Sequence, residues 1–244
     1  MKNPFIPLKK VNTILISNRI DESLKSLLKS LDINLLYTID NPNLAKPVAD
    51  HADMSVHPVT DKLFIVDNSV YSYYKNLLDP YGIEVISSST SLTSKYPMDC
   101  LLNVSRIQNY YIHNTVTEPS LESQLKSMGL ELIKVNQGYS KCSTLILNCD
   151  TIVTSDIGIH KTLIQYNINS NLIPQGNIEL KGYNTGFIGG CGGMISPDTL
   201  VLSGDPRTYL YGEALFKIIL DLGIHIEYVS NRKIVDFGSL IIID

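Results

Sequence analysis

The stretch "DCLLNVSRIQNYYIHNTVTEPSLESQLKSMGLELIKV", residues 99–135, carries the pattern that decides the fold. It holds apolar runs at 99–104 and 109–114, leucines at helical spacing within 118–129, and a last apolar run at 130–135. Short apolar runs predict strands, and Pro119 is suited to the first turn of the helix. The stretch therefore predicts a unit of two strands, a helix and a third strand.

The same order of elements returns elsewhere in the chain. Three more units cover 53–87, 143–174 and 186–230, and residues 12–39 supply a strand, a helix that Asp21 is placed to cap, and a strand. The final apolar run, 236–244, has no helix after it and supplies the missing first strand of 12–39. Five units of roughly 40 to 50 residues are typical of propellers. We therefore expect one α/β domain over 1–244, a five-bladed propeller closed by the C-terminal strand.

Composition narrows the possible functions. The 244 residues are 44% hydrophobic and 18% charged, which is typical of a globular core rather than a disordered chain. The net charge is -4, and Lys and Arg occur in runs no longer than a pair, so neither nucleic acid nor a membrane surface is an expected partner. From the apolar runs and the N-terminal pattern we expect neither a signal peptide nor a membrane span, and we expect a cytoplasmic protein.

The four cysteines are scattered, without CxxC pairs. This spacing argues against both a zinc site and a disulfide framework, so we expect reduced thiols and no bound metal.

Residues with ionisable or nucleophilic side chains recur at one place in each unit, at the start of the first strand. The segments are "HADM" at 51–54, "PMDC" at 97–100, "SKCS" at 140–143, "GFIGGC" at 186–191 and "VDFG" at 235–238. Ring closure brings these starts toward a common axis. The residues expected to face one central cleft are His51, Asp53, Asp99, Cys142 and Asp236. Ionisable groups gathered in a cleft are costly unless they are used, so this cleft is the candidate site.

The stretch "HADMSVHPVTDKLFIVD", residues 51–67, resembles the His-x-Asp strand pair of the guanidino-group-modifying enzymes. This pentein superfamily includes arginine deiminases, amidinotransferases, agmatine deiminases and dimethylarginine dimethylaminohydrolases. Residues 99–148 are similar in order and spacing to the last units of these hydrolases, where "KCSTLIL" at 141–147 matches a nucleophilic Cys followed by a small hydroxyl residue and a strand. The resemblance implies a five-bladed α/β propeller.

The resemblance also implies a chemistry. Cys142 would be the nucleophile, His51 the general acid and base, and Asp53 a polar partner near the substrate, in a hydrolase or transferase that forms a covalent thiouronium on a guanidine or amidine. Lys141 is expected to lower the pKa of the thiol. No cofactor is implied, and the expected partner is a small molecule. The candidate substrate-binding residues are Asp99, Asp236, Asn103 and Cys191.

One unit departs from the family pattern. Most members carry acidic residues in their early units, whereas the corresponding unit here reads "FIGGCGG", with Gly189, Gly190 and Cys191 where an acid is expected. A carboxylate that would hold the guanidinium is therefore missing from this unit. This unit also follows the Cys142 unit instead of preceding the His51 unit, as in a circularly permuted ring.

Two alternatives follow from this departure. The chain is either an enzyme or a catalytically inactive pentein that binds a protein partner, because one fold can serve both roles. Cys191, flanked by glycines, is a second candidate for the reactive thiol. His57 lies six residues beyond His51, and we expect it at a solvent-exposed strand end.

Overall fold

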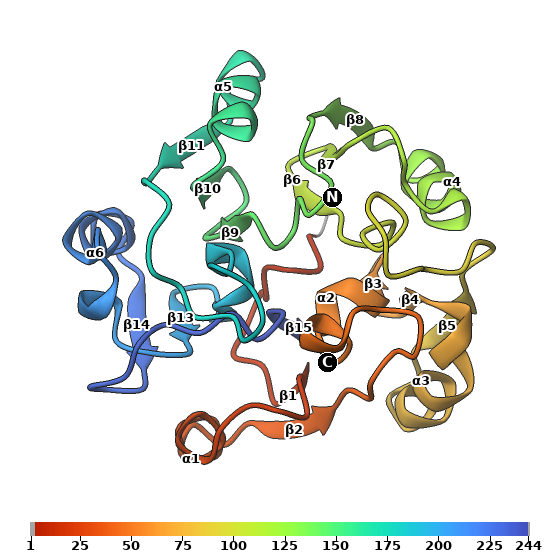
Figure 1. Cartoon of the computed structure of the whole chain (residues 1–244), viewed down its shortest axis with the longest axis horizontal. Helices are drawn as coiled ribbons and strands as arrows, with labels where there is room; N and C mark the ends of the chain where they lie inside the picture. The colour runs from red at the N-terminus through yellow and green to blue at the C-terminus, as the bar shows by residue number, and fades with distance from the viewer. Residues whose placement is uncertain (1–2, 244) are drawn as a thin grey trace.

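The computed structural model describes residues 3–243 as five blades arranged around a ring (Figure 1). Each blade is a sheet of three strands, in which the inner strand runs antiparallel to the middle strand and the middle strand runs parallel to the outer one. A helix between the middle and outer strands lies at the periphery of the ring. The predicted five-bladed α/β propeller is confirmed.

Each blade consists of an inner, a middle and an outer strand and one helix. In this order, the elements are β15 (Leu240–Ile242), β1 (Thr13–Ile16), β2 (Asn34–Tyr37) and α1 (Glu22–Ser30); β3 (Val56–Pro58), β4 (Leu63–Val66), β5 (Glu84–Ser87) and α3 (Tyr71–Leu78); β6 (Ser105–Ile107), β7 (Tyr110–His113), β8 (Glu131–Lys134) and α4 (Pro119–Ser127); β9 (Thr144–Ile146), β10 (Thr151–Thr154), β11 (Asn169–Leu172) and α5 (Ile157–Gln165); β12 (Gly192–Ser196), β13 (Thr199–Leu202), β14 (His225–Tyr228) and α6 (Gly212–Asp221).

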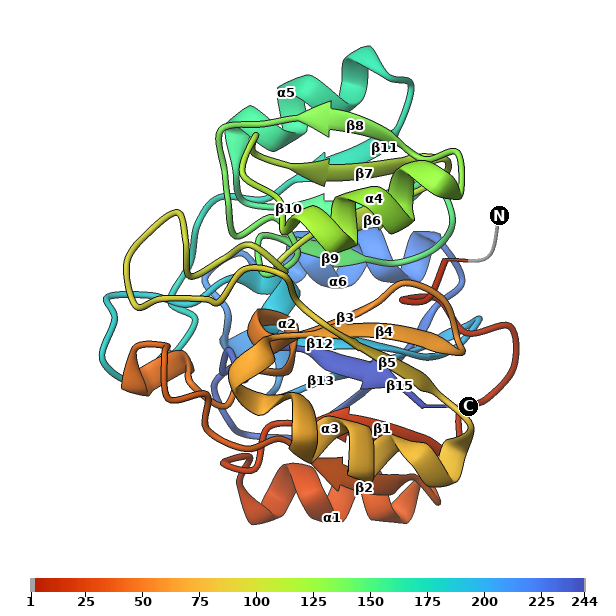
Figure 2. The ribbon, with the colours of Figure 1, turned by 90° about the vertical axis from the view of Figure 1, so that its right-hand side faces the viewer.

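The two ends of the chain share one blade, as the sequence predicted. Strand β15 pairs antiparallel with β1, with Ile14 opposite Ile242 and Ile16 opposite Leu240. This pairing gives the N-terminal unit its inner strand and closes the ring. The first and last segments of the described chain lie on the same side of the ring when it is viewed from the edge (Figure 2).

An acidic residue caps the first helical turn of every blade. In each case a carboxylate accepts a hydrogen bond from a backbone N–H of that turn, which satisfies a donor that the helix itself leaves unpaired. The five caps are Asp21, Asp67, Glu118, Asp156 and Asp205. The sequence predicted Asp21 as a cap and Pro119 in the first turn of α4, and both lie where they were expected.

The core lies between neighbouring blades. Leu24 and Leu28 of α1 pack with Ile14 of β1 and also with Val201 of β13, which belongs to the adjacent blade. Each buried aliphatic side chain of this kind contributes about 1.5–3 kcal/mol to folding. Within residues 3–243, no helix has the length and apolar content needed to cross a membrane.

Three predicted inner strands begin later than expected. The residues before them form the short helix α2 (Ala52–Ser55), a turn over 99–104, and the 3₁₀ helix η4 (Ile188–Gly190). Apolar side chains in these segments fill the centre of the ring rather than a sheet, as Met54 and Leu101 do. His51 and Asp53 therefore belong to a helical turn and not to a strand.

Candidate active site

The five segments that precede the inner strands are joined in a closed circle of hydrogen bonds. Each bond involves at least one backbone group. They run from Asp53 N–H to Gly238 O (3.2 Å), Phe237 N–H to Gly190 O (3.0 Å), Gly189 N–H to Cys142 O (2.7 Å), Lys141 N–H to Asn103 O (3.1 Å), and the Asn103 side-chain amide to Asp53 O (3.0 Å). This circle holds the segments, and the side chains they carry, in fixed relative positions.

Cys142 lies between an aspartate and an asparagine. Its thiol donates a hydrogen bond to Asp53 Oδ2 at 3.2 Å and accepts one from Asn103 Nδ2 at 3.0 Å. Asn103 Oδ1 in turn accepts from the backbone N–H groups of Lys141 (2.9 Å) and Cys142 (3.0 Å). Asn103 thus orients the turn that carries the thiol as well as contacting the sulfur.

The surroundings of Cys142 favour the protonated thiol. Burial raises the pKa of Cys142 well above its ordinary value, and the negative charges of Asp53 and Asp236 raise it further. Lys141 acts in the opposite direction, as the sequence predicted, but more weakly. The expected direction of the Lys141 effect is therefore right, but burial is the larger effect and the net shift of the Cys142 pKa is upward.

Asp53 is a buried carboxyl group with spare hydrogen-bonding capacity. Burial raises its pKa, and the positive charge of Lys141 opposes that effect. Within residues 3–243, its Oδ1 atom has no hydrogen-bond partner. A buried acceptor without a partner is costly, and a donor placed beside Cys142 would satisfy it.

His51 faces the second carboxylate of the site. Its Nδ1 atom lies 3.8 Å from Asp236 Oδ1. Two backbone N–H groups fix that carboxylate, from Phe187 to Oδ2 (2.8 Å) and from Gly238 to Oδ1 (3.1 Å). His51 is the N-cap of α2, and its side chain makes no capping hydrogen bond, so the ring remains turned toward Asp236.

Asp236 provides the acid that the glycine-rich unit lacks. A Cβ atom added to Gly190 would lie only 2.0 Å from Asp236 Oδ1, so the carboxylate occupies the space beside this glycine. The glycine-rich unit itself carries no acid, as the sequence indicates, and the carboxylate beside it belongs to Asp236 of the neighbouring segment. Only a residue without a side chain permits this approach.

Apolar side chains cover the thiol. Cys142 is 3% exposed and packs in a cluster with Leu44 and Met54, against which Tyr139 and Phe187 also lie. The rings of Tyr139 and Phe187 are 5.9 Å apart. A ligand would have to displace part of this cover to reach the sulfur.

A cavity of about 670 Å³ reaches the other half of the site. His51 and Asp236 line it, together with Asp50, Arg19 and other residues of the first blade and of 180–182. Cys142 is not among its lining residues. This cavity reaches His51 and Asp236, whereas Cys142 is buried among the apolar side chains described above.

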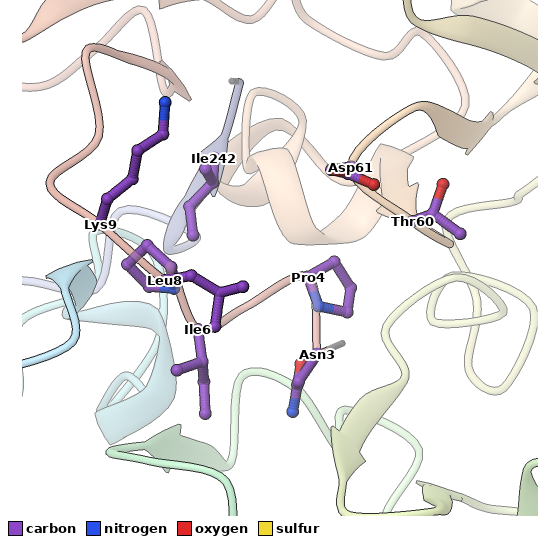
Figure 3. A pocket seen from close by; sticks show the side chains of 9 residues that line it. Asn3, Pro4, Ile6, Leu8, Lys9, Thr60, Asp61 and Ile242 are labelled. Atoms are coloured by element: carbon purple, nitrogen blue, oxygen red, sulfur yellow. The ribbon is translucent and has the colours of Figure 1, made fainter. Parts of the chain in front are cut away.

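A second cavity, of about 460 Å³, lies away from the candidate site residues. The N-terminal segment, the turn after β3 and strand β15 form its walls, as Asn3, Leu8, Thr60, Asp61 and Ile242 show in Figure 3. Its lining includes none of the residues that the sequence singled out. It therefore plays no part in the proposed chemistry.

The two remaining candidates are placed differently. Asp99 accepts a hydrogen bond from the Tyr139 hydroxyl, and no contact joins it to His51 or Cys142 within the described residues. Cys191 is fully buried, and its thiol donates to Phe187 O at 3.1 Å. Burial raises the pKa of Cys191 well above its ordinary value, as it does for Cys142, so the pKa does not separate the two thiols; Cys142 differs because its sulfur contacts the side chains of Asp53 and Asn103.

His57 is buried, contrary to expectation. It lies on β3 with 1% exposure, its Nδ1 is 3.2 Å from Leu102 O, and the Phe5 ring packs edge-on against it. Burial lowers its pKa to about 3, so the imidazole is neutral near neutral pH. Its place between two blades, under the N-terminal segment, was not visible from strand alternation alone.

The buried His57 should make the fold sensitive to acid. Its folded-state pKa of about 3 lies below the unfolded value of about 6.5, so the unfolded chain binds the proton first and stability falls as pH drops below about 6.5. Between pH 7.5 and pH 5 this residue alone should cost about 2 kcal/mol. Urea unfolding at both pH values should show that His57→Gln reduces the loss by that amount. An equal loss in the variant and the wild type would contradict the assignment.

The comparisons with known proteins agree with this architecture. A family model described as "Family of unknown function (DUF6873)" matches residues 15–241. The chain belongs to this family. No sequence among the curated proteins matches it.

Solved structures show which fold the DUF6873 chain has. A mutant of DDAH from Pseudomonas aeruginosa complexed with citrulline is similar with a TM-score of 0.56 at 11% identity, over 91% of this chain and 92% of that one. An inosamine-phosphate amidinotransferase from Streptomyces griseus gives 0.57 at 12% identity, over 98% and 95%. Agmatine deiminase from C. jejuni gives 0.56 at 10% identity, over 92% and 89%. All are penteins, so the DUF6873 chain has the pentein fold.

Some of the groups that shape the site were not apparent from the sequence. The Phe187 N–H that fixes Asp236 is a backbone donor, which no side-chain pattern reveals. Asn103 was singled out, but not its bonds to the Cys142 turn. Its position just before an inner strand, like that of Cys142, was the available indication.

Proposed function

We propose that the DUF6873 chain is a Cys-dependent hydrolase or transferase of a guanidine or amidine, with Cys142 as nucleophile and His51 as general acid and base. One observation carries the proposal: a thiol, an unpartnered carboxylate oxygen and a His–carboxylate pair are held together by the circle of hydrogen bonds. Three proteins of the same fold are named for DDAH, amidinotransferase and agmatine deiminase activity, which makes this substrate class the first to test.

Two carboxylates suit a planar cation. A guanidinium presents several N–H donors in a rigid plane, and carboxylate oxygens bind them with charge-assisted hydrogen bonds. Asp53 Oδ1 is free to accept such a donor within the described residues, and Asp53 Oδ2 lies beside the sulfur. Asp236 would hold the opposite side of the group near His51.

The raised pKa of Cys142 fits a substrate that is itself a cation. A positive charge brought beside the thiol favours the thiolate, so binding of a guanidinium would lower the pKa that burial and Asp53 have raised. The nucleophile would then form only when the substrate is present. This coupling would protect the empty site from unspecific thiol chemistry.

The proposed reaction proceeds in two balanced halves. The Cys142 thiolate attacks the central carbon of R–NH–C(NH₂)₂⁺ to form a C–S bond, and one C–N bond breaks as ammonia or an amine leaves with a proton from His51. Water then gives a proton to His51 and adds to the thiouronium carbon. The C–S bond then breaks while the remaining hydroxyl proton passes to the released ammonia or amine, and the products are a urea, an ammonium ion and the regenerated thiolate. In a transferase, an acceptor amine replaces the water.

The burial of the Cys142 thiol favours a second function, that of a catalytically inactive binding module. Cys142 is buried among apolar side chains, as expected for a pentein that has lost catalysis and binds a partner through its ring. The same cover fits an enzyme only if it moves when the substrate binds.

A direct experiment separates these two functions. The protein is incubated with a panel of guanidines and amidines, release of ammonia or amine is measured, and the acid-quenched protein is digested for mass spectrometry. An enzyme gives product and, with a slow substrate, a covalent adduct on the Cys142 peptide. A panel that yields neither product nor adduct would reject the enzymatic proposal and favour a binding module.

A further inference from the structure

Lys141 is a buried cation at the back of the candidate site. It is 5% exposed and immediately precedes Cys142. Its ammonium group donates to Gly189 O (3.1 Å) and to Ser239 Oγ (2.9 Å), and it lies 5.4 Å from the centre of the Phe5 ring. Within residues 3–243, no carboxylate is close enough to form a salt bridge with it. A buried ammonium group whose direct hydrogen-bond partners are both neutral is costly and calls for an explanation.

Backbone atoms lie between the Lys141 ammonium group and the Asp236 carboxylate. Gly189 bonds to the ammonium group on one side, and the next residue, Gly190, contacts Asp236 on the other. Lys141 opposes the rise in pKa that burial imposes on Asp53 and Cys142. Burial in turn lowers the pKa of Lys141, while Asp53, Cys142 and Asp236 act to raise it.

The far side of Lys141 is sealed. The cavity beside it measures about 10 Å³ and is lined by Phe5, Ser239 and Leu240 among others. Such a space holds about one water molecule at most. Little solvent therefore screens the positive charge, and its interaction with the carboxylates of the site is stronger than it would be at the protein surface.

We infer that Lys141 is a positioning residue, an internal counter-ion that keeps Asp53 charged and permits Cys142 to lose its proton. This inference rests on the proposed function. With a guanidinium bound, the thiol ionised and His51 holding the proton for the leaving group, the negative charges of Asp53, Asp236 and Cys142 face three positive ones, the substrate, His51 and Lys141. Without Lys141, three negative charges would face two positive ones, which disfavours the thiolate.

The experiment follows the titration of the Asp53 carboxyl group rather than the turnover of a substrate. The ¹³Cγ chemical shift of Asp53, assigned with Asp53→Asn, is followed against pH in the wild type and in Lys141→Met. Loss of the buried cation should raise the titration midpoint of Asp53 by about one pH unit or more. Lys141→Arg, which keeps the charge, should restore at least half of that shift. An unmoved midpoint in a folded Lys141→Met protein overturns the inference.

Two further variants complete the test. Ser239→Ala removes one hydrogen bond to the ammonium group but leaves its charge, so it should move the Asp53 midpoint by less than about 0.3 pH unit. Lys141→Gln keeps a donor without the charge and replaces Lys141→Met if the latter does not fold. A shift in Asp53 without guanidine turnover in the wild type would support the role of Lys141 and reject the proposed function. Guanidine turnover by the wild type without a shift in the Asp53 midpoint would support the proposed function and overturn the role of Lys141.

Discussion

Replacing Cys142 by alanine is expected to reduce turnover of the accepted guanidine or amidine by at least about 10⁴-fold. The sulfur is the one nucleophile in the described part of the site that hydrogen-bonds both Asp53 and Asn103. Without it, the covalent route has no first step, and the remaining side chains can only bind the substrate. Initial rates of product release, measured with the wild type and the variant at equal concentration, provide the test.

Cys191→Ala is the matched control for this measurement. Cys191 is also buried, and its thiol donates only to a backbone carbonyl in the described structure. Its removal should leave turnover within about threefold of the wild type while changing buried volume to the same extent as Cys142→Ala. Full activity in Cys142→Ala, or a large loss in Cys191→Ala alone, would move the nucleophile assignment away from Cys142.

Much of the fold was predictable because every blade repeats one short pattern. Each blade combines an apolar middle strand with a helix that has buried apolar side chains at helical spacing, such as Leu24 and Leu28 in α1 and Tyr74 and Leu78 in α3. These regularities depend on local spacing and so can be found in the sequence. The strand at 240–242 was also predictable, since it had no helix of its own and a partner strand was missing at the N-terminus.

The contents of the ring centre were only partly predictable. Residues at the starts of inner strands could be expected to converge, and the structure joins His51 to Asp236 and Asp53 to Cys142. Which atoms meet depends on turns whose geometry does not follow from periodicity. His57 shows the same limit, since strand alternation placed it near solvent although an adjacent blade and the N-terminal segment bury it.

The thiol pKa illustrates a second limit. A neighbouring lysine in the sequence suggested a lowered pKa for Cys142, and Lys141 does act in that direction. The larger effects, burial and the charge of Asp53, arise from residues far away in the sequence. The local sequence thus indicates that Lys141 lowers the pKa of Cys142, but it does not indicate whether the net shift of that pKa is upward or downward.

Gly190→Ala is expected to lower turnover by about 10²-fold or more, because a displacement of about 1 Å at a reacting group can have that effect. The new Cβ atom would lie 2.0 Å from Asp236 Oδ1, so the carboxylate must move. That movement breaks its hydrogen bonds from the Phe187 and Gly238 backbone and changes its position relative to His51. The fold should also lose about 1–3 kcal/mol from overpacking, measurable by urea unfolding.

A double-mutant cycle tests the cause of this loss. In an Asp236→Ala background the clashing carboxylate is absent, so adding Gly190→Ala should cost much less stability than it does in the wild type. Gly158→Ala in α5 is the matched glycine control; its added Cβ meets only the flexible side chain of Asp156, at 3.1 Å, and should leave turnover unchanged. Equal costs of Gly190→Ala in both backgrounds would mean that the clash lies elsewhere. Unchanged turnover in folded Gly190→Ala would mean that the position of Asp236 does not govern the chemistry, and a different residue would have to hold the second side of the guanidinium.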